Sequence, residues 1–271
     1  MSDKFLAAVV QLQSGSDEDA NLSLSSELIE RAAGYGATLV STPENTNYLG
    51  PHKEKVRLAE GLDGKACTCF AELAAKHGIH LVLGSFNERS DEETRCLNTS
   101  VYFGPDGEIR GVYRKIHLFD VDVSKEVCFK ESATIQPGKE LVVVDDAVGA
   151  VGLSVCYDLR FPELYAQLVA KGAQILTVPS AFTLMTGKDH WYPLLCARAI
   201  ETQSYVLAAA QWGKHDDKGL RQSYGHSVII DPWGQVIGSA PEGPGLALAE
   251  IDLDRVASTR RSMPVESHRR L

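Results

Sequence analysis

The sequence lacks the long apolar segments of membrane-spanning and exported proteins. No run approaches the roughly 18 continuous apolar residues that a spanning helix needs. The first five residues, Met1-Ser2-Asp3-Lys4-Phe5, do not begin a charged region followed by an apolar one, so we expect no signal peptide. Internal repeats, low-complexity tracts and Pro/Ser-rich linkers are missing as well, which favours a single domain over residues 1–271.

Cysteine and clustered positive charge are also scarce. Six cysteines in 271 residues are too few for a disulfide scaffold, and the pair Cys67-x-Cys69 lacks the spacing and partners of a zinc site. A reducing cytoplasm is therefore the expected location. The net charge is −9 and the basic residues are scattered, apart from a short tail at 260–270, so we expect no nucleic-acid partner. The 44% hydrophobic content is that of a globular protein with a sizeable core.

Short apolar runs alternate with helical stretches along the chain. Strands are predicted at 6–12, 37–41, 79–85, 98–103, 108–113, 141–144, 150–155, 174–178 and 205–211. Helices are predicted at 16–35, with Ser16 as its start, and at 65–77, 162–171 and 191–204. A last hairpin turns at 231–234. Hairpins mixed with strand–helix alternation predict an α/β protein with two mixed sheets and helices outside, rather than a doubly wound sheet.

Three chemically capable side chains follow predicted strands. Glu44 comes after the strand at 37–41, Lys115 after the hairpin strand, and Cys156 directly after the strand at 150–155. Taken singly, Cys156 is more often a buried small hydrophobe, and the other two are more often surface charges. Taken together, they supply a nucleophile, a general base, and a cation that lowers the thiol pKa and holds an oxyanion.

The segments around these residues resemble the three catalytic motifs of the nitrilase, or carbon–nitrogen hydrolase, superfamily. The segments are 43–44, 113–118 and 156–163, in the family's order and with its wide spacing. The resemblance covers the whole chain. It implies a four-layer α-β-β-α sandwich, a homodimer or higher homo-oligomer, and an amidase that needs no metal or organic cofactor.

The same resemblance implies a role for each residue. Cys156 is the nucleophile that forms a thioester, Glu44 the general base, and Lys115 the oxyanion stabiliser, helped by the backbone N–H of Tyr157. Glu131 looks like the family's second glutamate, which positions substrate and lysine. The alternative for Glu131 is an acid on a surface loop.

A further set of segments resembles the Nit branch of this superfamily. These segments are 180–182, 186–187, 190–191, 197–203, 208–211 and 223–227. Of these, 208–211 and 223–227 look closer to the deaminated glutathione amidases than to the ω-amidases, which act on α-ketoglutaramate or α-ketosuccinamate and remain the alternative. The implied partner is a small amide with an α-keto acid end. Acyl transfer to an amine and a non-catalytic interaction protein are less favoured, because the triad is intact and no acceptor motif is visible.

A keto-acid substrate needs a cation for its carboxylate, and Arg160 is the first candidate. A guanidinium can bind a carboxylate through two parallel hydrogen bonds. The alternative is that Arg160 pairs internally with an acid such as Glu163. Thr186 and His190 are weaker candidates, for which helix capping is equally plausible. A Cys–His dyad with His226 is not favoured, because the sequence around Cys156 is not papain-like.

Overall fold

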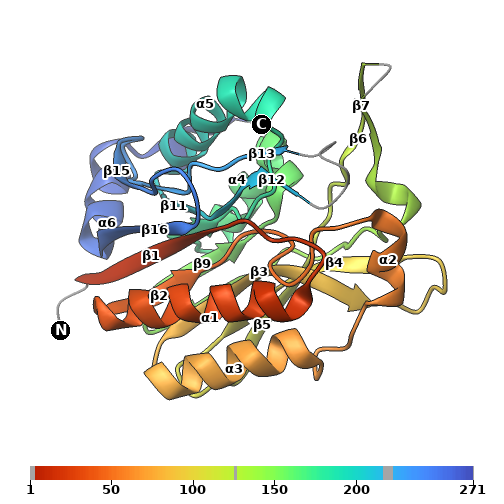
Figure 1. Ribbon diagram of the computed structural model, residues 1–271. Helices are drawn as coiled ribbons and strands as arrows, with labels where there is room; N and C mark the ends of the chain where they lie inside the picture. The colour runs from red at the N-terminus through yellow and green to blue at the C-terminus, as the bar shows by residue number, and fades with distance from the viewer. Residues whose placement is uncertain (1–3, 125–126, 216–221, 271) are drawn as a thin grey trace.

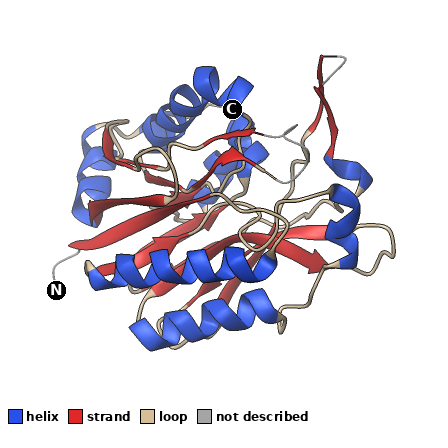
Figure 2. Ribbon diagram, viewed as in Figure 1, coloured by secondary structure: helices blue, strands red, loops and turns tan. Residues whose placement is uncertain are grey.

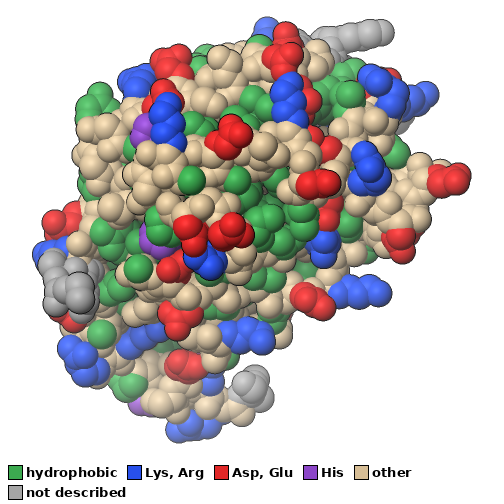
Figure 3. Space-filling view, turned by 90° about the horizontal axis from the view of Figure 1, so that it is seen from below, with side chains coloured by type: hydrophobic (Ala, Val, Ile, Leu, Met, Phe, Trp, Pro, Cys, Tyr) green, Lys and Arg blue, Asp and Glu red, His purple; other side chains and the backbone are tan. Residues whose placement is uncertain are grey.

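The computed structural model describes residues 4–124, 127–215 and 222–270. Two mixed β-sheets lie face to face, and helices cover the outer face of each sheet (Figure 1, Figure 2). This arrangement confirms the predicted α-β-β-α sandwich. Among the described residues, no helix is both long enough and apolar enough to cross a membrane. On the face shown in Figure 3, acidic and basic side chains are interspersed, with no gathered basic patch.

The first sheet is built mainly from the amino-terminal half of the chain. Its strands are β1 (Lys4–Leu12), β2 (Ala37–Ser41), β3 (His80–Arg89), β4 (Cys96–Phe103), β5 (Ile109–Arg114), β12 (Ala210–Lys214), β13 (Gln222–Tyr224) and β16 (Gly245–Asp252). The order is β13-β12-β1-β2-β3-β4-β5, and β16 pairs with β1. Strands β1 to β3 run parallel, whereas β4 and β5 continue the sheet antiparallel.

The second sheet comes from the carboxyl-terminal half. Its strands are β8 (Val143–Asp146), β9 (Gly149–Leu153), β10 (Ile175–Thr177), β11 (Tyr205–Ala208), β14 (Val228–Ile230) and β15 (Val236–Ser239). Their order is β15-β14-β11-β10-β9-β8, with the central strands β9, β10 and β11 parallel. A separate hairpin, β6 (Asp120–Ser124) and β7 (Val127–Lys130), projects from the sandwich (Figure 1).

Helices form the two outer layers. The first sheet is covered by α1 (Glu18–Gly34) and α3 (Lys65–His77), and the second by α4 (Pro162–Ala170) and α5 (Leu184–Thr202). The shorter elements are α2 (His52–Arg57), η1 (Glu131–Ala133), η2 (Cys156–Arg160), α6 (Leu253–Ser262) and α7 (Val265–His268).

Strand β1 shows how the layers are held together. Successive side chains of a strand point to opposite faces, so an apolar run can serve two cores. Ala8 and Val10 pack with the residues of α1 and α3, whereas Ala7 and Val9 pack into the core that reaches the second sheet. The continuous apolar run therefore reflects burial on both faces, as predicted.

Three details of the predicted elements were wrong. Asp17, not Ser16, caps α1, because its side chain accepts the N–H of Ala20. Helix α5 begins at Leu184, well before the predicted start at 191. The run at 205–211 is not one strand, because β11 and β12 belong to different sheets and the chain crosses between them at Ala209.

The early start of α5 is fixed by a cap just before the helix. The side chain of Thr183 caps the helix by accepting the N–H of Thr186. The sequence predicts the start of this helix at residue 191. In the structure Gly187 packs directly against Tyr224, where any Cβ would collide with the tyrosine ring. The glycine therefore allows a close contact and does not end the helix.

Candidate active site

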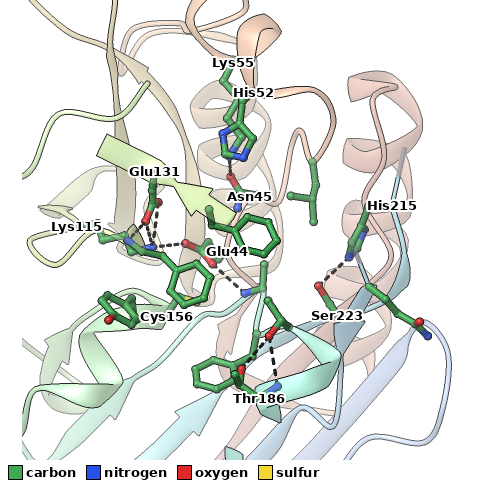
Figure 4. A pocket seen from close by; sticks show the side chains of 18 of the residues that line it. Glu44, Asn45, His52, Lys55, Lys115, Glu131, Cys156, Thr186, His215 and Ser223 are labelled. Atoms are coloured by element: carbon green, nitrogen blue, oxygen red, sulfur yellow. Dashed lines mark hydrogen bonds and ion pairs between the residues drawn. The ribbon is translucent and has the colours of Figure 1, made fainter. Parts of the chain in front are cut away.

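Four buried polar side chains meet where strands of both sheets end. Glu44 follows β2, Lys115 follows β5, Glu131 opens η1, and Cys156 opens η2 after β9. Their exposed fractions are 3%, 2%, 8% and 8% in that order. Figure 4 shows Lys115 between the carboxylates of Glu131 and Glu44. The structure thus brings together side chains that lie up to 112 positions apart in the chain (156 − 44).

The turn at Cys156 holds its side chain away from the sheet. Its φ is +51°, a left-handed conformation that is uncommon for a residue other than glycine. The backbone N–H of Cys156 donates to the carbonyl of Pro179 at 2.9 Å. The next N–H, that of Tyr157, lies in the first turn of η2, where N–H groups have no partner within the helix. This geometry is suited to a nucleophile beside an N–H that can hold an oxyanion.

Asp158 ties this turn to the segment that carries Lys115. Its fully buried carboxylate accepts the N–H of Val155 at 2.8 Å and the hydroxyl of Tyr113 at 2.6 Å. It also accepts the backbone N–H of His117 at 3.1 Å. Tyr113 and His117 flank Lys115 on either side. Asp158 lies inside the motif at 156–163, but its position in the sequence did not predict a role for it.

Hydrogen bonds fix the orientation of Glu44. Its Oε1 accepts Lys115 Nζ at 2.8 Å and Asn98 Nδ2 at 2.9 Å, and its Oε2 accepts the N–H of Ala181 at 2.9 Å. Behind Glu44, a side chain at Gly84 would collide with the carbonyl of Thr42, so only glycine allows β3 to approach this closely.

Glu131 holds Lys115 from the other side. Lys115 Nζ lies 2.9 Å from Glu131 Oε2 and 3.0 Å from its Oε1. Glu131 Oε2 also accepts the N–H of Phe119 at 2.6 Å. At the backbone, the N–H of Gly138 donates to the carbonyl of Lys115 at 2.8 Å. Glu131 is therefore buried in the cluster and does not lie on a surface loop.

The charges of the cluster depend on one another. Burial pushes the pKa of Glu44 upward, but the charge and hydrogen bond of Lys115, with bonds from Cys156 and Ala181, outweigh burial and hold the pKa below its ordinary value. Burial alone would lower the pKa of Lys115, yet Glu131 and Glu44 raise it well above the ordinary value. A carboxylate and an ammonium therefore face each other in the resting site.

The thiol behaves differently from the expectation that a nearby lysine lowers its pKa. Burial, followed by the charge of Glu44, raises the pKa of Cys156 well above its ordinary value, and the opposing effect of Lys115 is smaller. The lysine acts in the expected direction but is outweighed. Cys156 is therefore a neutral thiol hydrogen-bonded to Glu44, and it has to lose its proton before its sulfur can act as a thiolate.

These residues lie in a cleft with an empty volume of about 730 Å³. That volume includes the open space at the mouth of the cleft. Its apolar wall is aromatic and comes from Phe119, Phe129, Tyr157 and Phe182. A cleft of this composition can take a ligand with an apolar or extended body and polar ends.

Arg160 lines this cleft. Its guanidinium carbon lies 5.3 Å from the ring centre of Phe182 and 5.9 Å from that of Tyr157. One of its nitrogens lies 3.4 Å from His190 Nδ1. The ion pairs of the described residues include none between Arg160 and Glu163.

The two weaker candidates lie differently. Thr186 lines the cleft, and its hydroxyl is 2.8 Å from that of Thr183. His190 is exposed and is not part of the cleft wall. It contacts Arg160 from outside the cleft wall. His226 is also absent from the wall, and its Nδ1 lies 2.8 Å from the carbonyl of Tyr224.

The cleft has further polar residues that the sequence analysis did not find. Lys55 Nζ donates to Asn45 Oδ1 at 2.8 Å, and His52 lies beside them (Figure 4). His215 Nε2 lies 2.8 Å from Ser223 Oγ. Asn45 could have been found by its position directly after Glu44. Ser223 lies in the segment 223–227, which resembles the Nit branch, whereas His52, Lys55 and His215 lie outside every recognised motif.

Comparison with known proteins agrees with this geometry. The family model described as carbon–nitrogen hydrolase matches residues 6–261. Deaminated glutathione amidase of Bos taurus is 44% identical, covering 98% of this chain and 82% of the relative. The protein of the same name from Synechocystis sp. strain PCC 6803 is 42% identical, covering 98% of both. The crystal structure of Saccharomyces cerevisiae Nit3, a member of branch 10 of the nitrilase superfamily, superposes with a TM-score of 0.88 at 33% identity, covering 99% of this chain and 97% of Nit3.

Proposed function

The chain belongs to the carbon–nitrogen hydrolase family, and on that premise we propose that it hydrolyses deaminated glutathione to 2-oxoglutarate and Cys-Gly. The observation that carries the proposal is the buried cluster of Cys156, Glu44 and Lys115 at the floor of an aromatic-walled cleft. Relatives above 40% identity bear the name of this amidase. Amide hydrolysis itself follows from membership of the family.

The first half-reaction forms a thioester. As Cys156 Sγ attacks the amide carbon, Glu44 accepts the thiol proton, because the resting thiol is neutral and Glu44 is ionised. The negative charge on the carbonyl oxygen is held by the ammonium of Lys115 and the backbone N–H of Tyr157. Glu44 then gives its proton to the nitrogen, the C–N bond breaks, and Cys-Gly leaves as a neutral amine.

The second half-reaction regenerates the enzyme. Glu44 accepts a proton from water, and the resulting hydroxide oxygen attacks the thioester carbon. The tetrahedral intermediate is held by the same ammonium and N–H, and it collapses by breaking the C–S bond. The departing sulfur of Cys156 recovers the proton from Glu44, and 2-oxoglutarate leaves. Glu131 contributes by holding the Lys115 ammonium in place at 2.9 Å.

The keto-acid end of the substrate is assigned to Arg160 and Thr186. Both line the cleft, and the planar guanidinium lies near the rings of Tyr157 and Phe182, whose faces attract its positive charge. His190 supports Arg160 from the outside at 3.4 Å. A bidentate grip here would fix the acyl half of the substrate relative to Cys156.

We also propose a single carbon–nitrogen hydrolase domain over residues 1–271, a cytoplasmic location and a homodimer or larger homo-oligomer. Helix α5 exposes Met185 and Ile200, each 50% accessible, which a subunit contact would cover. Sedimentation at micromolar concentration is expected to give a species heavier than the 29.5 kDa chain. A 29.5 kDa species alone would contradict the oligomer.

The test of the function compares two substrates. Deaminated glutathione should be cleaved with a higher kcat/KM than α-ketoglutaramate. The first reaction is measured by the release of Cys-Gly, and the second by the release of ammonia. Both reactions also yield 2-oxoglutarate, which gives one common assay. A higher kcat/KM for α-ketoglutaramate would instead identify the protein as an ω-amidase.

A further inference from the structure

The cleft has a second cationic end, away from Arg160. Figure 4 shows Lys55 and His52 on one side of Glu44 and Thr186 on the other. All four residues line the same cleft. A linear ligand that passes Glu44 can therefore meet polar groups at both of its ends.

Lys55 is the buried cation of this second end. It is 3% exposed, whereas Lys53 and Arg57 of the same short helix are exposed to solvent. Lysine is seldom buried, because taking an ammonium out of water is costly. Helix α2 thus turns one of its three cations inward, to the wall of the cleft.

Asn45 holds the Lys55 ammonium in place. Its Oδ1 accepts Lys55 Nζ at 2.8 Å, and its φ of +56° is left-handed. Its backbone N–H donates to Ser85 Oγ at 2.9 Å. Asparagine adopts this conformation more readily than most residues, and hydrogen bonds of its side chain and its backbone N–H fix Asn45 from two sides. Asn45, the residue after Glu44, thus holds the Lys55 ammonium at the wall of the cleft that Glu44 also lines.

The reaction decides which part of the substrate faces Lys55. Glu44 must donate a proton to the leaving nitrogen, so the leaving group has to lie on the side of Glu44. The proposed leaving group, Cys-Gly, ends in a carboxylate about 7 Å from that nitrogen when extended, the span of two residues. With the acyl end placed at Arg160 and Thr186, this carboxylate extends past Glu44 toward the Lys55 side of the cleft.

We propose that Lys55 binds the terminal carboxylate of the leaving dipeptide, with Asn45 as its positioning residue. The inference rests on the proposed function and adds the feature that would select substrates by their leaving group. Attraction between an ammonium and a carboxylate is strong at a site with little water. Arg160 binds the carboxylate at the acyl end of the substrate, and Lys55 binds the carboxylate of the leaving group.

The test uses deaminated glutathione and the same molecule with its glycine carboxylate converted to a primary amide. Wild-type enzyme should lose about 10–150-fold in kcat/KM on amidation, the usual effect of losing a charged hydrogen bond. The kcat/KM of Lys55→Met for deaminated glutathione should fall by a similar factor. Its kcat/KM values for deaminated glutathione and for the amidated compound should differ by no more than about twofold. Lys53→Met, an exposed neighbour on the same helix, is the matched control and should behave as wild type.

Equal kcat/KM of the wild type on both compounds would overturn the inference, whether or not a variant folds. So would a Lys55→Met enzyme that still discriminates as wild type does. Lys55→Gln provides a second variant if the methionine variant melts early. Failure of the proposed function looks different: the wild type would release ammonia from α-ketoglutaramate but leave deaminated glutathione intact.

Discussion

The catalytic cluster and the Arg160 end of the same cleft are built in different ways. In the cluster, each side chain is at most 8% exposed, and Glu44 and Glu131 accept hydrogen bonds on both carboxylate oxygens. Arg160 is half-buried, lies against aromatic faces and has a 3.4 Å contact with an exposed histidine. The side chains proposed to make and break bonds are thus buried and fixed by hydrogen bonds, whereas the proposed recognition group is more exposed and less tightly held. Changes in the cluster should therefore affect turnover, and changes at Arg160 should affect binding.

Removing the nucleophile should have the largest effect. Cys156→Ala and Cys156→Ser are expected to abolish turnover and keep the fold, because only this thiol can form the thioester. Intact-mass measurement with a slow substrate should show an acyl adduct on the wild type and none on the variants. An adduct mapped by peptide analysis to Cys67, Cys96 or another cysteine would reject the assignment.

Glu44→Gln tests the acid–base role with almost unchanged shape. We expect kcat to fall by about 10²–10⁴-fold or more, because proton transfer is lost in both half-reactions. Stopped-flow measurement should show acylation slowed as well as deacylation. Activity above about a tenth of wild type would indicate that another residue is the base.

Arg160→Lys distinguishes recognition from scaffolding. Lysine cannot make two parallel hydrogen bonds, so KM for a keto-acid amide should rise by about 10–150-fold with a smaller change in kcat. An amide without that carboxylate should be affected much less. Equal losses on both substrates, together with a lower melting temperature, would make Arg160 a structural residue. Thr186 would then be the next candidate for the carboxylate.

A change of pH within the neutral range should have the smallest effect on kcat/KM of all these changes. Glu44 must be ionised to act as base, and its pKa lies below the ordinary value of 4.5, so kcat/KM should decline only as pH falls through that lower value. The same group stabilises the fold above its unfolded pKa, and this contribution disappears as pH falls through the folded pKa. A loss of activity between pH 6 and 7 that follows a histidine titration would argue for a Cys–His mechanism.

Much of the site could be predicted from the sequence. Glu44, Lys115 and Cys156 each follow a strand inside a recognisable motif, and the order of the three motifs is informative without coordinates. The helix at 65–77 and the hairpin over 98–113 were predicted because their apolar spacing and turn residues are local signals. Strand ends and catalytic motifs are encoded by neighbours in the chain, which is why one sequence can reveal them.

Other properties were decided by the tertiary structure. The pKa of Cys156 depends on burial and on two charges from distant segments, so the local argument from Lys115 gave the wrong net direction. Asp158 lies inside a motif and Lys55 lies outside all of them, but the contacts of both depend on groups from distant segments. The break between β11 and β12 likewise follows from the packing of two sheets. Local pattern determined which residues could react; their burial and mutual distances, set by long-range packing, determined their charge and their partners.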